Sequence, residues 1–169
     1  MKSNLINLTI LIISYKSVNK LETCISHIGL NKNIIVVENS DNIKIKEFIE
    51  NKYKNCKVIM NNKNLGYGKA SNIGFKESKS KYVLLLNTDI VIKESQILEI
   101  EKEILNCKFK FALASPIYDD LIDFNKNKNF DKDLNQYSLD INNKEDNLTK
   151  VDLVKGCALI VNLDEFENK

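Results

Sequence analysis

Lys81-Tyr-Val-Leu-Leu-Leu-Asn-Thr-Asp89 is a short apolar run that stops at a polar corner. Residues 82–86 are aromatic or branched and apolar on both faces, which is typical of a strand in a parallel sheet covered by helices on both sides. The corner places Asp89 at the carboxyl end of that strand, where open α/β sheets bind ligands. Asn87 and Asp89 therefore either hold a cation against a phosphate or serve only as turn and cap residues.

Apolar runs and helical spacings alternate on both sides of this stretch. Strands are predicted at 8–13, 33–37, 57–60, 82–86 and 109–114, the last of them stopped by Pro116. Helices are predicted over 18–28 with Gly29 as its stop, around 45–49 with Phe48 on its apolar face, up to about 78, and around 97–105. This alternation predicts an α/β fold with a mostly parallel central sheet and helices on both faces.

The pattern changes after residue 115, although we expect a single domain over residues 1–169. Residues 116–150 form a polar excursion rich in Asn, Lys and Asp, with room for one short strand or hairpin. Order returns over 151–161, which predicts one more strand. The last residues, 164–169, begin an element that the chain has no room to finish.

Composition excludes several classes of function. The 169 residues carry 25 basic and 23 acidic side chains, a net charge of +2 that favours neither nucleic acid nor an anionic membrane surface. The four cysteines and the single histidine, His27, lack the spacing of a zinc site. The apolar run 8–13 is too short to span a bilayer. We therefore expect a cytoplasmic protein, with peripheral contact at the inner face of the membrane left open.

Three polar corners follow three predicted strands, at Ser14-Tyr15, Glu38-Asn39 and Asn87-Thr-Asp89. In a parallel sheet they meet at one edge. Between them lies Asn64-Leu-Gly-Tyr-Gly-Lys-Ala-Ser-Asn-Ile-Gly74, whose small residues allow backbone to approach a phosphate or nucleoside. The same segment also fits a tight strand-to-helix turn packed on the sheet. It lacks the third glycine of a dinucleotide fingerprint, because Ser71 stands in that place.

Taken in order, these motifs resemble glycosyltransferase family 2. The corners at Ser14-Tyr15, Glu38-Asn39 and Asn87-Thr-Asp89, the segment 64–74 and Val-Lys-Gly156-Cys-Ala follow the family order at familiar spacing. The rhamnosyltransferase-like branch is the most similar. The resemblance implies a Rossmann-like GT-A fold, with nucleotide-sugar-binding βα units over 1–115 and the start of the acceptor-side half over 151–169.

The resemblance also implies the reaction. The expected donor is a UDP-, dTDP- or GDP-linked sugar, held with Mg²⁺ or Mn²⁺ and transferred with inversion to a hydroxyl of a glycan or lipid-linked acceptor in polysaccharide biosynthesis. Asn87-Thr88-Asp89 corresponds to the DXD-type motif, with Asp89 as the metal ligand and Asn87 in place of the first carboxylate. A cation held by one carboxylate plus phosphates would stabilise the charge of the leaving diphosphate.

Further site residues follow from the same resemblance. Ser14 and Tyr15 would line the nucleotide, although Tyr15 could either stack on a base or pack at the sheet edge. Glu38 stands where the family usually has Asp at the base or ribose, and its extra methylene shifts its reach. The remaining residues are Asn64, Gly66 and Asn72 beside the nucleoside and diphosphate, and Gly156 near the donor sugar and acceptor.

No residue of this chain is assigned as the catalytic base. The family's base segment would begin just past Lys169, and Asp164 and Glu165 are interpreted as surface acids. The chain is then either part of a longer enzyme or a catalytically incomplete donor-binding or scaffold domain. An unrelated doubly wound domain, such as a phospho-acceptor or dinucleotide binder, is a third reading.

Overall fold

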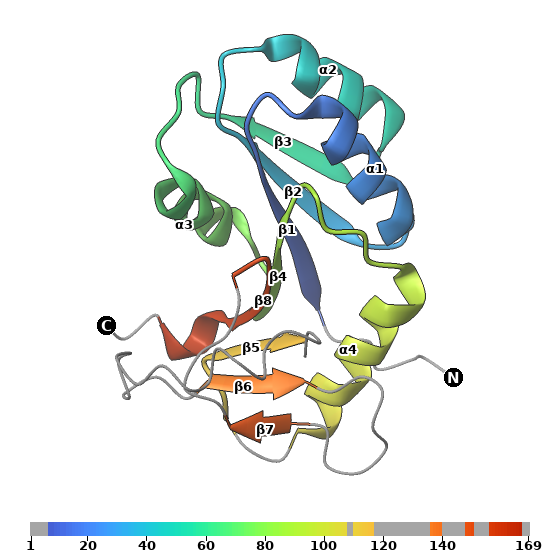
Figure 1. The fold of residues 1–169 in the computed structure, drawn as a ribbon, viewed down its shortest axis with the longest axis vertical. Coiled ribbons are helices and arrows are strands. Elements are labelled where there is room, and N and C mark those ends of the chain that lie inside the picture. The colour runs from blue at the N-terminus through green and yellow to red at the C-terminus, as the bar shows by residue number, and fades with distance from the viewer. Residues whose placement is uncertain (1–6, 108–109, 117–135, 140–147, 151–155, 167–169) are drawn as a thin grey trace.

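A computed structural model describes residues 7–107, 110–116, 136–139, 148–150 and 156–166. Within them, one eight-stranded sheet carries helices on both faces (Figure 1). The strands are β1 (Leu8–Ser14), β2 (Asn33–Glu38), β3 (Cys56–Met60), β4 (Tyr82–Asn87), β5 (Leu113–Pro116), β6 (Gln136–Leu139), β7 (Leu148–Lys150) and β8 (Ala158–Asn162). The helices are α1 (Val18–Ile28), α2 (Ile43–Lys52), α3 (Tyr67–Glu77) and α4 (Glu94–Asn106), and a 3-10 turn, η2 (Leu163–Glu165), follows β8.

The sheet has the strand order β3-β2-β1-β4-β8-β5-β6-β7. β1 lies between β2 and β4 and is parallel to both, and β3 continues the parallel pairing beside β2. β8 enters antiparallel between β4 and β5. The predicted α/β fold with a mostly parallel sheet and helices on both faces is thus confirmed.

Alternation along the central strands sends side chains to two different cores. Ile10 and Ile12 of β1 face a core that includes the apolar faces of α1, α2 and α4. Leu11 and Ile13 point to the opposite side, where α3 packs with Ala70. Because both faces of the sheet are covered, the central strands carry apolar side chains on both faces, as the sequence pattern of a buried parallel sheet requires.

Some predicted boundaries are wrong. The strand expected at 109–114 is β5 at Leu113–Pro116, so Pro116 ends the strand instead of stopping it earlier. Phe111 and Ala112 are buried without being in a strand, and Phe111 stacks on Tyr82 with ring centroids 5.8 Å apart. The apolar run therefore indicated burial correctly and strand pairing incorrectly. Phe109 lies outside the described residues.

Other differences are smaller. Phe48 and Leu105 flank the apolar faces of α2 and α4 and are 42% and 50% exposed, so they do not belong to the core. The last strand, β8, begins at Ala158 and ends at Asn162, one residue past the predicted stretch 151–161, and residues 151–155 of that stretch lie outside the described part. β6 and β7 pair antiparallel within the polar excursion, in agreement with the expected hairpin.

Gly74 lets α3 lie close against β1. A Cβ at this position would come within 2.2 Å of Leu11 Cδ1 and 2.9 Å of Leu11 Cγ. We expect Gly74→Ala to lower the free energy of unfolding by about 1–3 kcal/mol, because overpacking outweighs the better helix propensity of alanine. Urea unfolding of the purified chain measures this loss.

Gly68 provides the matched control in the same helix, since a Cβ there meets no atom within 4 Å. Gly68→Ala should raise stability by about 0.4–1 kcal/mol, because it restricts the unfolded chain and improves helix propensity. If both alanine variants were equally stable, close packing at Gly74 would not be the reason for its glycine.

Candidate functional site

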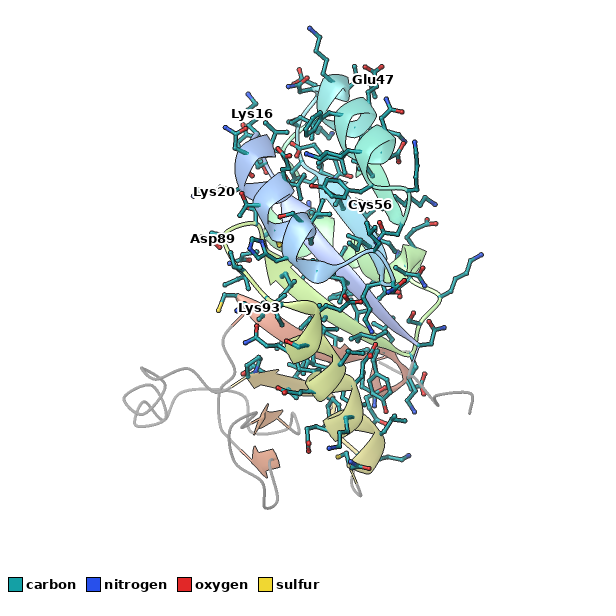
Figure 2. All side chains as sticks on the ribbon, turned by 90° about the vertical axis from the view of Figure 1, so that its right-hand side faces the viewer. Lys16, Lys20, Glu47, Cys56, Asp89 and Lys93 are labelled. Atoms are coloured by element: carbon teal, nitrogen blue, oxygen red, sulfur yellow. The ribbon has the colours of Figure 1, made fainter. Side chains whose placement is uncertain are left out.

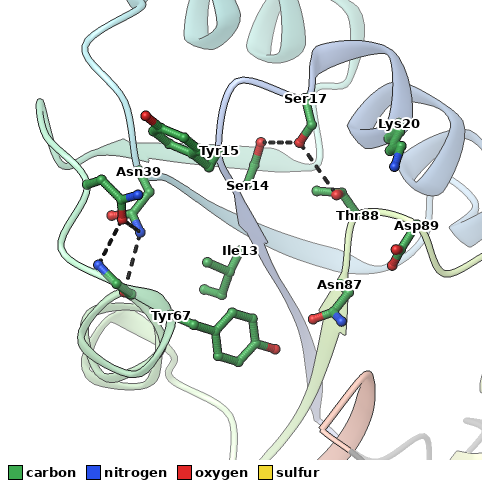
Figure 3. A pocket seen from close by; sticks show the side chains of 12 residues that line it. Ile13, Ser14, Tyr15, Ser17, Lys20, Asn39, Tyr67, Asn87, Thr88 and Asp89 are labelled. Atoms are coloured by element: carbon green, nitrogen blue, oxygen red, sulfur yellow. Dashed lines mark hydrogen bonds between the residues drawn. The ribbon is translucent and has the colours of Figure 1, made fainter.

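A pocket of about 540 Å³ opens at the carboxyl ends of the central strands. The strand register explains its position, because Ser14 at the end of β1 lies opposite Glu38 of β2 and Ile13 lies opposite Asn87 of β4. The three polar corners therefore meet at one edge of the sheet (Figure 3). The lining residues are Ile13, Ser14, Tyr15, Ser17, Lys20, Asn39, Asn64, Gly66, Tyr67, Asn87, Thr88 and Asp89.

Asn39 holds one wall of the pocket together. This side chain is only 3% exposed, and its Nδ2 donates to Asn64 Oδ1 at 3.2 Å and to Gly66 O at 3.3 Å. Its Oδ1 accepts from Asn61 Nδ2 at 2.9 Å and from Leu65 N at 3.1 Å. The loop before α3 is thereby fixed to the end of β2, so its backbone forms a firm wall.

Hydroxyl groups bridge the opposite wall. Ser17 Oγ lies 3.4 Å from both Ser14 Oγ and Thr88 Oγ1, which links the turn after β1 to the corner after β4 (Figure 3). Ser17 and Gly66 are the N-cap residues of α1 and α3, and neither makes a side-chain capping hydrogen bond. Two helix N-termini with their positive dipole ends therefore border the pocket, an arrangement that favours an anionic ligand.

Opposite charges stand at the mouth of the pocket. Lys20 on α1 and Asp89 after β4 are both exposed, and they emerge with Lys16 on the same side of the molecule (Figure 2). The pKa of the buried Cys24 thiol is raised to about 12, mainly by burial and further by the negative charge of Asp89. Cys24 is thus a protonated core residue at neutral pH, and Lys20 and Asp89 are the charged groups that a ligand would meet.

The donor set at the corner fits a divalent cation that also binds phosphate. Asp89 supplies one carboxylate, with the amide of Asn87 and the hydroxyl of Thr88 beside it in the pocket lining. Among the described residues no three His, Cys, Asp or Glu side chains gather as a metal site. One carboxylate is enough for Mg²⁺ or Mn²⁺ when substrate phosphates complete the shell, so affinity for the metal alone should be low.

Comparison with known families places the chain. The family described as Glycosyl transferase family 2 matches residues 9–162. The chain belongs to this family. The match extends from β1 to the end of β8, so it includes all three strands whose ends form the pocket. The comparison with curated proteins found no match.

Solved structures share the fold. The mannosyltransferase PcManGT from Pyrobaculum calidifontis, in complex with GDP-Man and Mn²⁺, has a TM-score of 0.69 at 9% identity and covers 98% of this chain and 47% of its own. TarS 1–349 from S. aureus has a TM-score of 0.52 at 19% identity, covering 66% and 35%. The same TarS fragment with UDP-GlcNAc has a TM-score of 0.53 at 19% identity, covering 66% and 34%. The chain thus spans less than half the length of these structures, and the likeness establishes the GT-A fold.

Most of the residues that the family resemblance selected lie in the pocket. They are Ser14, Tyr15, Asn64, Gly66, Asn87, Thr88 and Asp89. Three others do not line it. Glu38 is completely buried behind the sheet edge, Asn72 lines a neighbouring apolar pocket on the far side of Tyr67, and Gly156 lies at the turn before β8.

The turn at Gly156 is nevertheless tied to the pocket. Tyr67 Oη donates to Gly156 O at 3.3 Å, and Asn87 N donates to Cys157 O at 3.0 Å. Burial raises the pKa of Tyr67 to about 12, with a smaller contribution from Cys157, so this hydroxyl remains a donor at neutral pH. The start of β8 is therefore held between α3 and the end of β4.

Besides the aliphatic Ile13, sequence reasoning missed four lining residues, Ser17, Lys20, Asn39 and Tyr67. Asn39 directly follows Glu38, and Ser17 comes two residues after Tyr15. Their place at a strand-end corner was a usable signal. Tyr67 lay inside the glycine segment. Lys20 is one of 25 basic residues, and only its position one turn after the N-cap of α1 could have marked it.

Side chains interpreted as surface residues are at the surface. His27 is exposed on α1 and its Nδ1 lies 2.8 Å from Thr23 O. Asp164 is half-exposed on η2 and pairs with Lys81 at 2.9 Å.

Across the described ranges, no helix is both long and apolar enough to cross a bilayer.

Proposed function

We propose that this chain binds a nucleotide-diphospho-sugar together with Mg²⁺ or Mn²⁺ and serves a glycosyltransferase that passes the sugar, with inversion, to an acceptor hydroxyl in glycan or polysaccharide biosynthesis. The observation that carries the proposal is the pocket at the carboxyl ends of β1, β2 and β4, where one carboxylate and two helix N-termini converge. Family membership supports it, as do the similar solved structures in complex with GDP-Man, UDP and UDP-GlcNAc.

The pocket has separate regions for the parts of such a donor. Tyr15 is 48% exposed and offers an aromatic face to a nucleobase. The backbone wall at Asn64 and Gly66 suits the ribose, since polar groups and a glycine line it. Asn87, Thr88 and Asp89 then receive the diphosphate at the corner. Asn72 remains a predicted contact of the nucleoside and diphosphate. Gly156 remains a predicted contact near the donor sugar and acceptor.

Charge at the diphosphate decides which residues matter most. Asp89 alone would repel the phosphates, so it serves as the carboxylate that holds the cation. A bound Mg²⁺ or Mn²⁺ would supply Lewis-acid stabilisation of the departing nucleoside diphosphate. Lys20 and the N-terminus of α1 add positive potential on the same side of the pocket.

Activation of the acceptor requires another group. Asp89 is the sole acidic side chain lining the pocket in the part of the chain that the structure describes, and the proposal commits it to the cation. Three statements remain predictions from the sequence: a catalytic base placed after Lys169, the rhamnosyltransferase-like branch, and the cytoplasmic location.

Calorimetric titration tests the donor site. UDP, GDP and dTDP are titrated into the purified chain in Mn²⁺ and again in EDTA. We expect at least one of them to bind, and to bind at least about tenfold more tightly with Mn²⁺, because the cation removes the repulsion between Asp89 and the diphosphate. Absence of metal-dependent binding for all three nucleotides would contradict the proposal.

A further inference from the structure

Glu38 is a buried carboxylate beside the pocket that does not line it. Its side chain is 0% exposed at the end of β2. Oε1 accepts a hydrogen bond from the backbone N–H of Lys16 at 3.1 Å, and Oε2 is buried with no hydrogen-bond partner among the described residues. Since burying a carboxylate is costly, its one directed contact calls for an explanation.

The residue that Glu38 contacts has an unusual backbone. Lys16 has φ +51°, in the left-handed region that residues with a Cβ seldom adopt. Lys16 follows Tyr15 and precedes Ser17, and both of these neighbours line the pocket. The left-handed turn at Lys16 thus reverses the chain between β1 and α1 and sets where both side chains point.

The base of this turn is fixed from β2 as well. Asn39 N donates to Ser14 O at 2.7 Å, so the backbone after β2 holds the end of β1. The Glu38 carboxylate then reaches past that point to the backbone N–H of Lys16. The turn is held by two successive contacts from the end of β2.

We propose that Glu38 is a positioning residue, which stabilises the left-handed turn at Lys16 and thereby places Tyr15 and Ser17 for the nucleotide. Glu38 acts through the turn and not by touching the base or ribose. For its nucleotide readout this inference rests on the proposed function.

The length of the side chain provides the first test. Aspartate is shorter by one methylene, so a 3.1 Å contact would open beyond hydrogen-bond range. Glutamine keeps both the length and an acceptor oxygen. We expect Glu38→Asp to weaken nucleotide binding in Mn²⁺ by about tenfold, and Glu38→Gln to stay within about threefold of the parent, because only Asp loses the hydrogen bond.

Relief of the backbone strain provides the second test. Glycine adopts positive φ freely, so Lys16→Gly makes the turn independent of the carboxylate. Glu38→Asp combined with Lys16→Gly should recover most of the lost affinity. Lys16→Ala removes the same side chain, whose Nζ lies 5.4 Å from the Tyr15 ring centroid, without relieving the strain, so it should rescue nothing.

A readout without ligand separates this inference from the proposed function. The chain has no tryptophan, so Tyr15→Trp introduces a single tryptophan as a fluorescent reporter on the turn. We expect the emission maximum and the acrylamide quenching of this reporter to change on Glu38→Asp and to return on addition of Lys16→Gly. If the parent chain bound no nucleotide, the proposed function would fail. The tryptophan emission would still show whether Glu38 stabilises the turn at Lys16.

Glu50→Asp is the matched control. Glu50 Oε1 accepts from the backbone N–H of Val58 at 2.8 Å, the same kind of contact away from the pocket. It should leave nucleotide affinity and the reporter unchanged. Parental affinity in Glu38→Asp, or a loss that Lys16→Gly does not restore, would overturn the positioning role, and the second result would indicate direct contact between Glu38 and the ligand.

Discussion

Asp89→Asn is expected to remove most of the metal-dependent part of nucleotide binding. The change keeps the size of the side chain and removes the one carboxylate that lines the pocket among the described residues. In Mn²⁺ we expect the Kd for the best nucleotide to rise at least about 10- to 100-fold, the loss typical when groups that merely support metal ligands are removed. Calorimetric titration of parent and variant in the same buffer gives both values.

The sign should reverse when the metal is removed. In EDTA the carboxylate only repels the diphosphate, so Asp89→Asn should bind about 2- to 5-fold more tightly than the parent. Asp41→Asn serves as a control, because Asp41 is an exposed acid after β2 that does not line the pocket. Equal affinities of Asp89→Asn and the parent in Mn²⁺ would show that the corner is only a turn.

Lys32→Met is expected to cause the largest loss of stability. Lys32 lies just before β2 and donates to both carboxylate oxygens of Glu101 on α4 at 2.6 Å. The two side chains are 7% and 3% exposed. Removal of the lysine leaves a buried carboxylate without its counter-charge, which costs about 3–5 kcal/mol and lowers Tm by roughly 6–20 °C in a domain of this size.

A double variant distinguishes the unpaired charge from lost packing. Lys32→Met with Glu101→Leu replaces the ion pair with apolar side chains and should return the free energy of unfolding to within about 1–2 kcal/mol of the parent. Urea unfolding monitored by circular dichroism measures all variants. A single variant that lost less than about 1 kcal/mol, or a double variant no better than the single, would contradict this account.

Local patterns predicted the central strands and the edge where their polar ends meet. The runs ending at Ser14, Glu38 and Asn87 are apolar on both faces, and such runs have few structural alternatives. Gly29, the predicted helix stop, lies at the C-cap of α1 with φ +90°, a backbone conformation that glycine adopts freely. Helical spacing predicts burial less well at the edges of a helix's apolar face. This is why the exposed Phe48 and Leu105 looked like core residues.

Contacts between segments far apart in the chain could not be predicted from local sequence patterns. The insertion of β8 between β4 and β5 depends on pairing between distant segments, which no local pattern records. Glu38 was selected from the family resemblance, but its contact with the left-handed backbone at Lys16 joins two segments that no local pattern relates. Lys20 came into the pocket through the angle at which α1 leaves the sheet, and that angle follows from tertiary packing.

The position of β8 also governs the order in which the chain can assemble. β1, β2 and β3 pair with segments close to them in sequence, whereas β4 meets both of its neighbours across long stretches of chain, with Leu8 of β1 and Asn162 of β8 each opposite Tyr82. Pairing across so long a stretch closes slowly, because a large loop must lose its freedom first. During synthesis the edge of β4 therefore waits, unpaired and apolar, until residue 162 has left the ribosome. An unpaired strand edge is a template for wrong pairing, so we expect the chain to be most prone to aggregation during that interval.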